Sequence, residues 1–94
     1  MQLSELLERL KDLAAELGLE VREARAGADG ETPLASGVCR VRGQTWVVLA
    51  SADDLERRVE VLAGALESHA GDRLEGRYLP PAVRARLSRH SQVG

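Results

Sequence analysis

The chain has 94 residues, of which 44% are hydrophobic and 2% aromatic, and its formal net charge at pH 7 is −2. This length fits one domain with a single core, residues 1–94, and the near-neutral charge points to no class of partner. The lone cysteine excludes an intramolecular disulfide, and without a leader or an apolar run of about 20 residues we expect a cytoplasmic protein that enters no membrane.

The first element is an amphipathic helix. Between Leu3 and Leu17 the leucines recur with the 3.6-residue period of a helix that buries one face. Ser4 is suited to cap its start, and Gly18 to end it in the left-handed conformation. The pattern predicts a helix over residues 3–17.

A strand and a loop follow. Residues 19–25 alternate between apolar and polar, as a half-buried strand does. Residues 26–35 contain Gly27, Asp29, Gly30 and Pro33 and show no periodicity. We expect a mobile loop over 26–35.

Two further strands are separated by Arg42 and Gly43, where glycine allows the positive φ of a tight hairpin. The second run, residues 46–50, is apolar at every position, so both of its faces should be covered and it should be the central strand. A two-residue turn puts Trp46 and Val48 on the same face as Cys39; a three-residue turn puts them on the opposite face.

Two helices complete the chain. The first should start at Ser51, in a sequence that resembles a capping box, and end near Gly71. After a connector with Leu74, Tyr78 and Leu79, the Pro80-Pro81 pair introduces a short helix over residues 82–90, with fraying over 89–94.

The order of elements predicts an α+β fold: helix, three strands, helix and short C-terminal helix. An antiparallel meander with both long helices on one face is the simplest arrangement. The same order occurs in double-stranded RNA-binding domains, but there the second helix begins with lysines, whereas this one begins with Asp53 and Asp54. These acids would repel phosphate and argue against that function.

No catalytic, metal or cofactor site is predicted. The candidate ligands Cys39, His69 and His90 lack the spacing of a metal site, and the junction at residues 50–54 has no glycine to hold a phosphate. Cys39 is most simply a small core residue, because alternation places Arg40 and Arg42 on the other side of the strand. A reactive thiol at Cys39 is the alternative.

The C-terminal segment is the basic part of the chain. Residues 1–70 hold 8 basic and 13 acidic groups, which gives −5, and residues 71–94 hold 5 and 2, which gives +3. These arginines could bind single-stranded nucleic acid, although solvation or pairing with the acidic second helix is the simpler role. They are Arg73, Arg77, Arg84, Arg86 and Arg89.

Helices on one face leave the other face of the sheet open, and the third strand supplies apolar groups to both. Either the connector residues Leu74, Tyr78 and Leu79 fold back over that face, or a second subunit or partner covers it. We therefore predict a non-catalytic interaction or regulatory module, either homodimeric or bound to another protein. The predicted docking residues are Trp46, Val48, Arg40, Tyr78, Pro80, Pro81 and Arg84.

A strand motif runs from Gly37 through Cys39 and Arg40 to Gly43, and the C-terminal segment Leu79-Pro80-Pro81 leads to Arg84. With these two motifs the chain resembles small bacterial proteins of unknown function, and the resemblance extends over nearly its whole length. The resemblance implies a bacterial origin and a shared fold, and no reaction. The ordinary roles of the motif positions are a bulge or close approach at Gly37, core packing at Cys39, a covering aromatic at Tyr78 and a salt bridge at Arg84.

Overall fold

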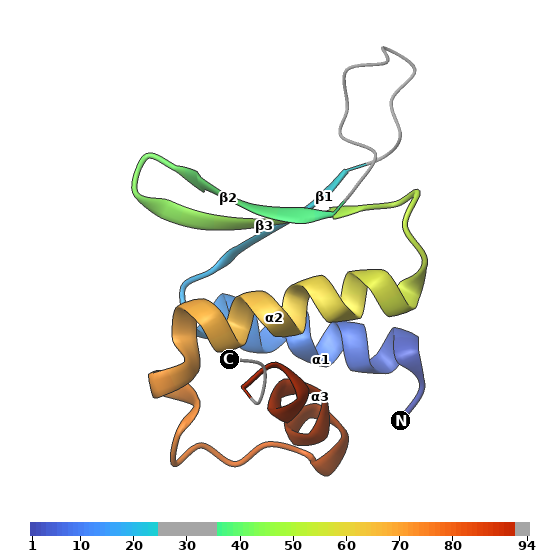
Figure 1. The fold of residues 1–94 in the computed structure, drawn as a ribbon, viewed down its shortest axis with the longest axis vertical. Coiled ribbons are helices and arrows are strands. Elements are labelled where there is room, and N and C mark those ends of the chain that lie inside the picture. Colours follow the sequence, from blue (N-terminus) through green and yellow to red (C-terminus); the bar gives the residue numbers. More distant parts are fainter. Residues whose placement is uncertain (25–35, 92–94) are drawn as a thin grey trace.

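The computed structural model describes residues 1–24 and 36–91 (Figure 1). It is an α+β fold with the element order helix, three strands and two helices. The predicted loop at 26–35 lies outside the described residues, as do residues 92–94 of the predicted frayed tail.

The sheet contains β1 (Glu20–Ala24), β2 (Gly37–Val41) and β3 (Gln44–Ala50), in the order β1-β3-β2. β2 and β3 are antiparallel, whereas β1 and β3 are parallel. The predicted antiparallel meander is therefore wrong. Its chain-order arrangement would leave β3 at an edge, whereas in the observed order β3 pairs with a strand on each side.

The hairpin between β2 and β3 has a two-residue turn. Arg42 and Gly43 have φ angles of 51° and 81°, and Val41 pairs with Gln44. Two positive φ angles are typical of the tight turn whose twist matches that of the strands. This turn selects the register in which Cys39 pairs with Trp46 on one face of the sheet.

The two long helices, α1 (Leu3–Glu16) and α2 (Leu55–Leu74), lie together below the sheet in Figure 1. Neither begins at the predicted serine. α1 is preceded by Gln2 without a side-chain cap, so Ser4 lies inside its first turn. α2 is capped by Asp54, whose carboxylate accepts a hydrogen bond from the Arg57 backbone N–H at 2.8 Å.

The start of α2 is later than predicted because the residues before it form a turn. The backbone N–H of Asp53 donates to the Ala50 carbonyl at 3.0 Å. At the other end, Ala70 has the non-helical angles φ −142° and ψ 18°, one residue before the predicted end at Gly71, and a last turn then continues to Leu74. Gly18 has φ +85°, as expected for the residue that ends the first helix.

The last helix, α3 (Pro81–Ser91), packs on α1 and α2 on the side away from the sheet (Figure 1). Its bounds differ by one residue at each end from the predicted 82–90. The described chain therefore has three layers: the sheet, the two long helices and α3. Side chains from all three layers form one core, which includes Leu10, Val47, Leu66, Val83 and Leu87.

Candidate functional site

The face of the sheet turned away from the helices carries apolar side chains. Along β3, Val47 and Leu49 are buried in the core, whereas Trp46 and Val48 on the opposite face are half-buried. Within the described part of the chain no helix or strand lies over Trp46 and Val48 (Figure 1). We call this surface the open face; its members are Glu20, Arg22, Cys39, Val41, Trp46 and Val48.

The connector does not fold back over the open face. Leu74 and Leu79 are buried in the core between the helices, at 7% and 8% exposure. Tyr78 is 83% exposed, so it is not the covering aromatic that its motif position suggested.

Arg22 is a member of the open face that the sequence did not single out. Its guanidinium carbon lies 4.8 Å from the centroid of the Trp46 ring, and its Nε is 3.0 Å from a carboxylate oxygen of Glu20. A guanidinium over an indole ring is a favourable cation–π contact. The parallel pairing of β1 with β3 brings Arg22 and Trp46 together. The predicted antiparallel meander did not pair these two strands, so the contact could not be predicted from it.

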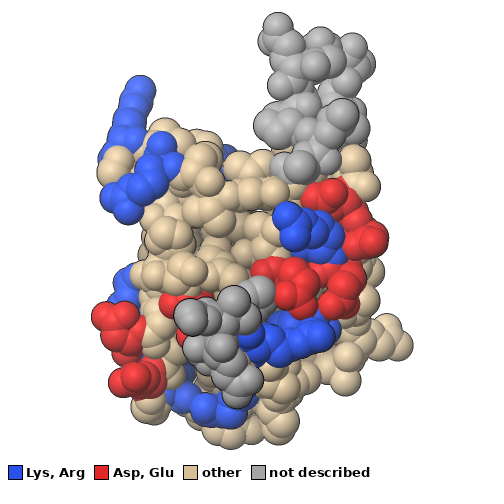
Figure 2. All heavy atoms as spheres, in the orientation of Figure 1, with Lys and Arg blue, Asp and Glu red and all other residues tan. Residues whose placement is uncertain are grey.

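Arg40 does not belong to the open face. It pairs with Thr45, which is buried on the helix side of the sheet, and its guanidinium donates to the Gly43 carbonyl at 3.0 Å. Arg40 and Arg42 form no ion pair with any described residue. Figure 2 shows basic side chains that extend from the hairpin end of the sheet, with no acidic group beside them on the face drawn.

The second group of predicted docking residues lies elsewhere. Tyr78 and Pro80 line a groove of about 550 Å³ between α1 and the segment before α3, together with Arg9 and Asp12. The segment before α3 and the sheet lie on opposite sides of the long helices (Figure 1). Trp46 and Val48 therefore lie apart from the other predicted docking residues, which are Tyr78, Pro80, Pro81 and Arg84.

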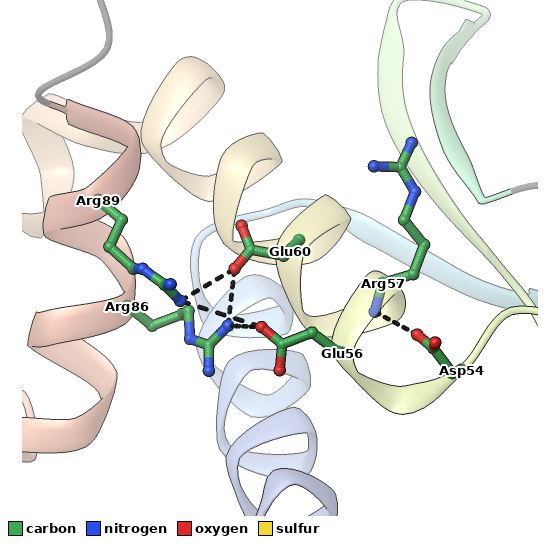
Figure 3. A network of polar contacts seen from close by, with 6 residues as sticks. All are labelled: Asp54, Glu56, Arg57, Glu60, Arg86 and Arg89. Carbon is green, nitrogen blue, oxygen red and sulfur yellow. Dashed lines mark hydrogen bonds and ion pairs between the residues drawn. The ribbon is translucent and has the colours of Figure 1, made fainter.

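Two of the C-terminal arginines pair with acids of α2 (Figure 3). Arg86 contacts Glu56 and lies 2.6 Å from Glu60, and Arg89 lies 3.2 Å from Glu60. The two carboxylates raise the pKa of Arg86, chiefly through its hydrogen bond to Glu56. These guanidinium groups are engaged in joining α3 to α2.

The other three arginines differ in their contacts. Arg77 lies 3.3 Å from a carboxylate oxygen of Glu16. Among the described residues, Arg73 and Arg84 donate only to backbone carbonyls, those of His69 and Arg77, each at 3.4 Å. Arg84 therefore lacks the salt bridge that its motif position suggested, as far as the described residues show.

Cys39 is exposed, so its predicted packing in the core is wrong. The pattern of residues 38–41 did not predict the exposure of Cys39, because that exposure depends on the position of β2 at the edge of the sheet. Gly37 is also not a point of close approach, because a Cβ placed on it would meet no atom within 4 Å. Among the described residues, no three His, Cys, Asp or Glu side chains converge as a metal site.

Comparison of the chain with protein-family models, with curated proteins and with solved structures found no match. No helix within residues 1–24 and 36–91 is both long and apolar enough to cross a membrane.

Proposed function

We propose that this chain is a non-catalytic, cytoplasmic protein–protein interaction module that docks a partner protein on the open face. The observation that supports the proposal most directly is the position of Trp46 and Val48: half-buried, apolar and without a helix or strand over them in the described chain. Val47 and Leu49, which point to the opposite face of the sheet, are buried in the core.

The chemistry of the open face suits protein recognition. Tryptophan and arginine are among the residue types that contribute most binding energy in protein interfaces, with losses of about 2 kcal/mol or more when an anchoring residue is truncated. The contact between Arg22 and Trp46 holds an aromatic ring and a cation together at the surface. A partner that buries both would combine apolar burial with a charged contact.

The docking surface we propose is smaller than the one expected from the sequence. It retains Trp46 and Val48 and adds Arg22. It excludes Arg40, the groove residues Tyr78 and Pro80, and Pro81 and Arg84 of α3. Arg22 joins it because β1 lies next to β3 in the sheet.

The experiment compares affinity capture by tagged wild-type protein and two variants, in extract from the cells in which the chain is native. Trp46→Ser removes the centre of the open face, and Tyr78→Ser is the matched control because Tyr78 is exposed on the other side of the helices. The expected result is a partner that wild type and Tyr78→Ser retain and Trp46→Ser loses. A partner retained equally by all three proteins would contradict the proposal.

Trp46 also provides a direct measure of docking because it is the only tryptophan in the chain. Titration with the purified partner, or with a fragment of it that lacks tryptophan, should shift the Trp46 emission to shorter wavelength as the ring leaves water. An unchanged emission at saturating partner would place the interface elsewhere and would overturn the proposed site.

A further inference from the structure

Among the described residues β2 pairs with β3 alone, and the hydrogen-bonding groups of its other edge can be assigned from the register. Val41 and Gln44 flank the two-residue turn and form the first hydrogen-bonded pair of the hairpin. Hydrogen-bonded and non-hydrogen-bonded pairs then alternate, so Cys39 bonds to Trp46. The backbone N–H and C=O groups of Val38 and Arg40 consequently point away from β3, toward the free edge.

We propose that a second copy of this chain pairs with this edge, β2 against β2 in antiparallel orientation, about a two-fold axis at Cys39. The inference extends the proposed function, because it describes how the open face is presented to a partner. Unpaired N–H and C=O groups on a strand edge are a template for another strand. A two-fold axis is the usual symmetry of a soluble dimer.

The register follows from the direction of the backbone groups. The backbone groups that point outward must bond to the outward-pointing groups of the partner subunit. Each even-numbered residue must therefore pair with an even-numbered residue. The pairing of Val38 with Arg40 of the partner subunit satisfies this condition and overlaps β2 over its full length, from Gly37 to Val41. Val38 and Arg40 then each exchange two hydrogen bonds with the partner subunit.

The side chains of β2 are compatible with this pairing. Val38 is 42% exposed, which is unusual for a valine in a strand, and the aliphatic part of Arg40 of the partner subunit would cover it. Gly37 leaves open space above it, into which Val41 of the partner subunit fits. No pair in this register places Arg40 directly opposite its own copy, so the like charges are diagonal neighbours.

The dimer would enlarge the docking surface. Its sheet would have six strands, and the two open faces would lie side by side with a Trp46 on each side of the axis. Cys39 would face its copy at a position where the Cα atoms of an antiparallel pair are about 4.5 Å apart. That separation lies within the range of about 4.4–6.8 Å that a disulfide spans.

The test combines mass measurement with cross-linking of the natural cysteine. Light scattering at several hundred micromolar should give twice the 10.2 kDa mass of the chain. Diamide, which oxidises two thiols to a disulfide and takes up their hydrogens, should then convert the exposed Cys39 to a covalent dimer rapidly and almost completely.

Two variants test the register. In Val38→Cys combined with Cys39→Ser, the Cα atoms of the two new cysteines are about 8 Å apart, because one lies two strand positions along and one strand spacing across from the other. This exceeds the roughly 7 Å limit for a disulfide, so cross-linking should be at least tenfold slower. Val38→Pro removes an outward N–H without touching the bonds to β3, so it should give a folded monomer by circular dichroism and light scattering.

The results separate this inference from the proposed function. A monomeric wild type, or equal cross-linking rates for the two cysteine positions, would overturn the β2 pairing but leave docking on the open face to the capture experiment. A dimer that Trp46→Ser dissociates and Val38→Pro does not would also overturn it, and would favour self-association through the open face itself.

Discussion

Ser36 and Asp53 are joined across the end of the sheet: the Ser36 backbone N–H donates to Oδ2 of Asp53 at 2.7 Å. The Ser36 hydroxyl oxygen in turn accepts a hydrogen bond from the Ala50 backbone N–H at 2.9 Å. Ser36 precedes β2, and Asp53 lies in the turn between β3 and α2. The two residues therefore connect the edge strand to the start of the second long helix.

We predict that Ser36→Ala lowers the free energy of unfolding by about 1–3 kcal/mol. The substitution leaves the buried Ala50 N–H without its acceptor, and an unsatisfied buried donor has a cost of that order. Urea unfolding followed by circular dichroism measures the change. Ser51→Ala is the control, because Ser51 is exposed and its substitution should change stability by less than about 0.5 kcal/mol. Equal effects of the two substitutions would contradict the assigned role of Ser36.

The second prediction concerns acid stability. The hydrogen bonds from Ser36, backbone first and then side chain, lower the pKa of Asp53 below its ordinary value of 3.8. A carboxyl group whose pKa is lower in the folded state stabilises the fold above its unfolded pKa, and that contribution is lost as the pH falls through the folded pKa. Stability should therefore decline below about pH 4, in part because of Asp53.

Asp53→Asn tests this prediction because asparagine keeps an oxygen acceptor for Ser36 but does not titrate. Urea midpoints measured from pH 6 to pH 2 should fall less steeply for the variant than for wild type. Glu23 contributes in the same direction, since its hydrogen bond and charge contact with Lys11 lower its pKa, so Asp53→Asn should flatten the curve only partly. Parallel curves for wild type and variant would show that Asp53 has no part in acid unfolding.

Patterns within single elements predicted most of the fold. The leucine period located α1, the consecutive apolar residues at 46–50 identified β3 as the central strand, and Arg42-Gly43 predicted the turn. The neighbours of β3 could not be derived in the same way. Local periodicity carries no information on which strands pair, and preference for adjacent pairing in chain order is only a tendency.

The predicted meander contained a conflict that pointed to the correct strand order. A strand that is apolar on both faces belongs in the interior, but a three-strand meander in chain order leaves the third strand at an edge. Placing β3 between β1 and β2 resolves the conflict and also brings Arg22 over Trp46. The exposure of Cys39 could not be predicted because it depends on β2 being an edge strand.

The third prediction distinguishes two arginines of α3 that contact the same acids. The Arg86 side chain is 15% exposed and contacts both Glu56 and Glu60, whereas that of Arg89 is 61% exposed. Partly buried, charge-assisted contacts stabilise proteins more than exposed pairs, which contribute about 0–1 kcal/mol. We expect Arg86→Ala to lower the free energy of unfolding by about 1–2 kcal/mol and Arg89→Ala by less than about 0.5 kcal/mol.

Urea unfolding in low salt and in 0.5 M salt measures both effects. The Arg89→Ala effect should disappear in high salt, because ions screen an exposed pair more than a partly buried one. Equal losses for the two variants would mean that α3 is held by its apolar anchors, Val83 and Leu87, and not by the Arg86 contacts.

The last prediction addresses single-stranded nucleic acid, the alternative ligand for the C-terminal arginines. Three of them, Arg77, Arg86 and Arg89, pair with carboxylates, which leaves Arg73 and Arg84 without an ion pair among the described residues. Each phosphate contact on a single strand contributes about −0.7 to the slope of log K against log salt concentration. Two available arginines predict a slope of about −1.4, whereas all five would give about −3.5.

Fluorescence anisotropy of a labelled oligouridine, titrated at several salt concentrations, measures this slope. We expect weak binding that is lost by physiological salt, because two phosphate contacts supply little affinity. The double variant Arg73→Ala and Arg84→Ala should abolish the remainder, and Arg40→Ala with Arg42→Ala at the hairpin is the matched control for removal of two positive charges. A slope near −3.5 would show that the strand displaces Glu16, Glu56 and Glu60 from their arginines, and nucleic-acid binding would then replace protein docking as the function best supported.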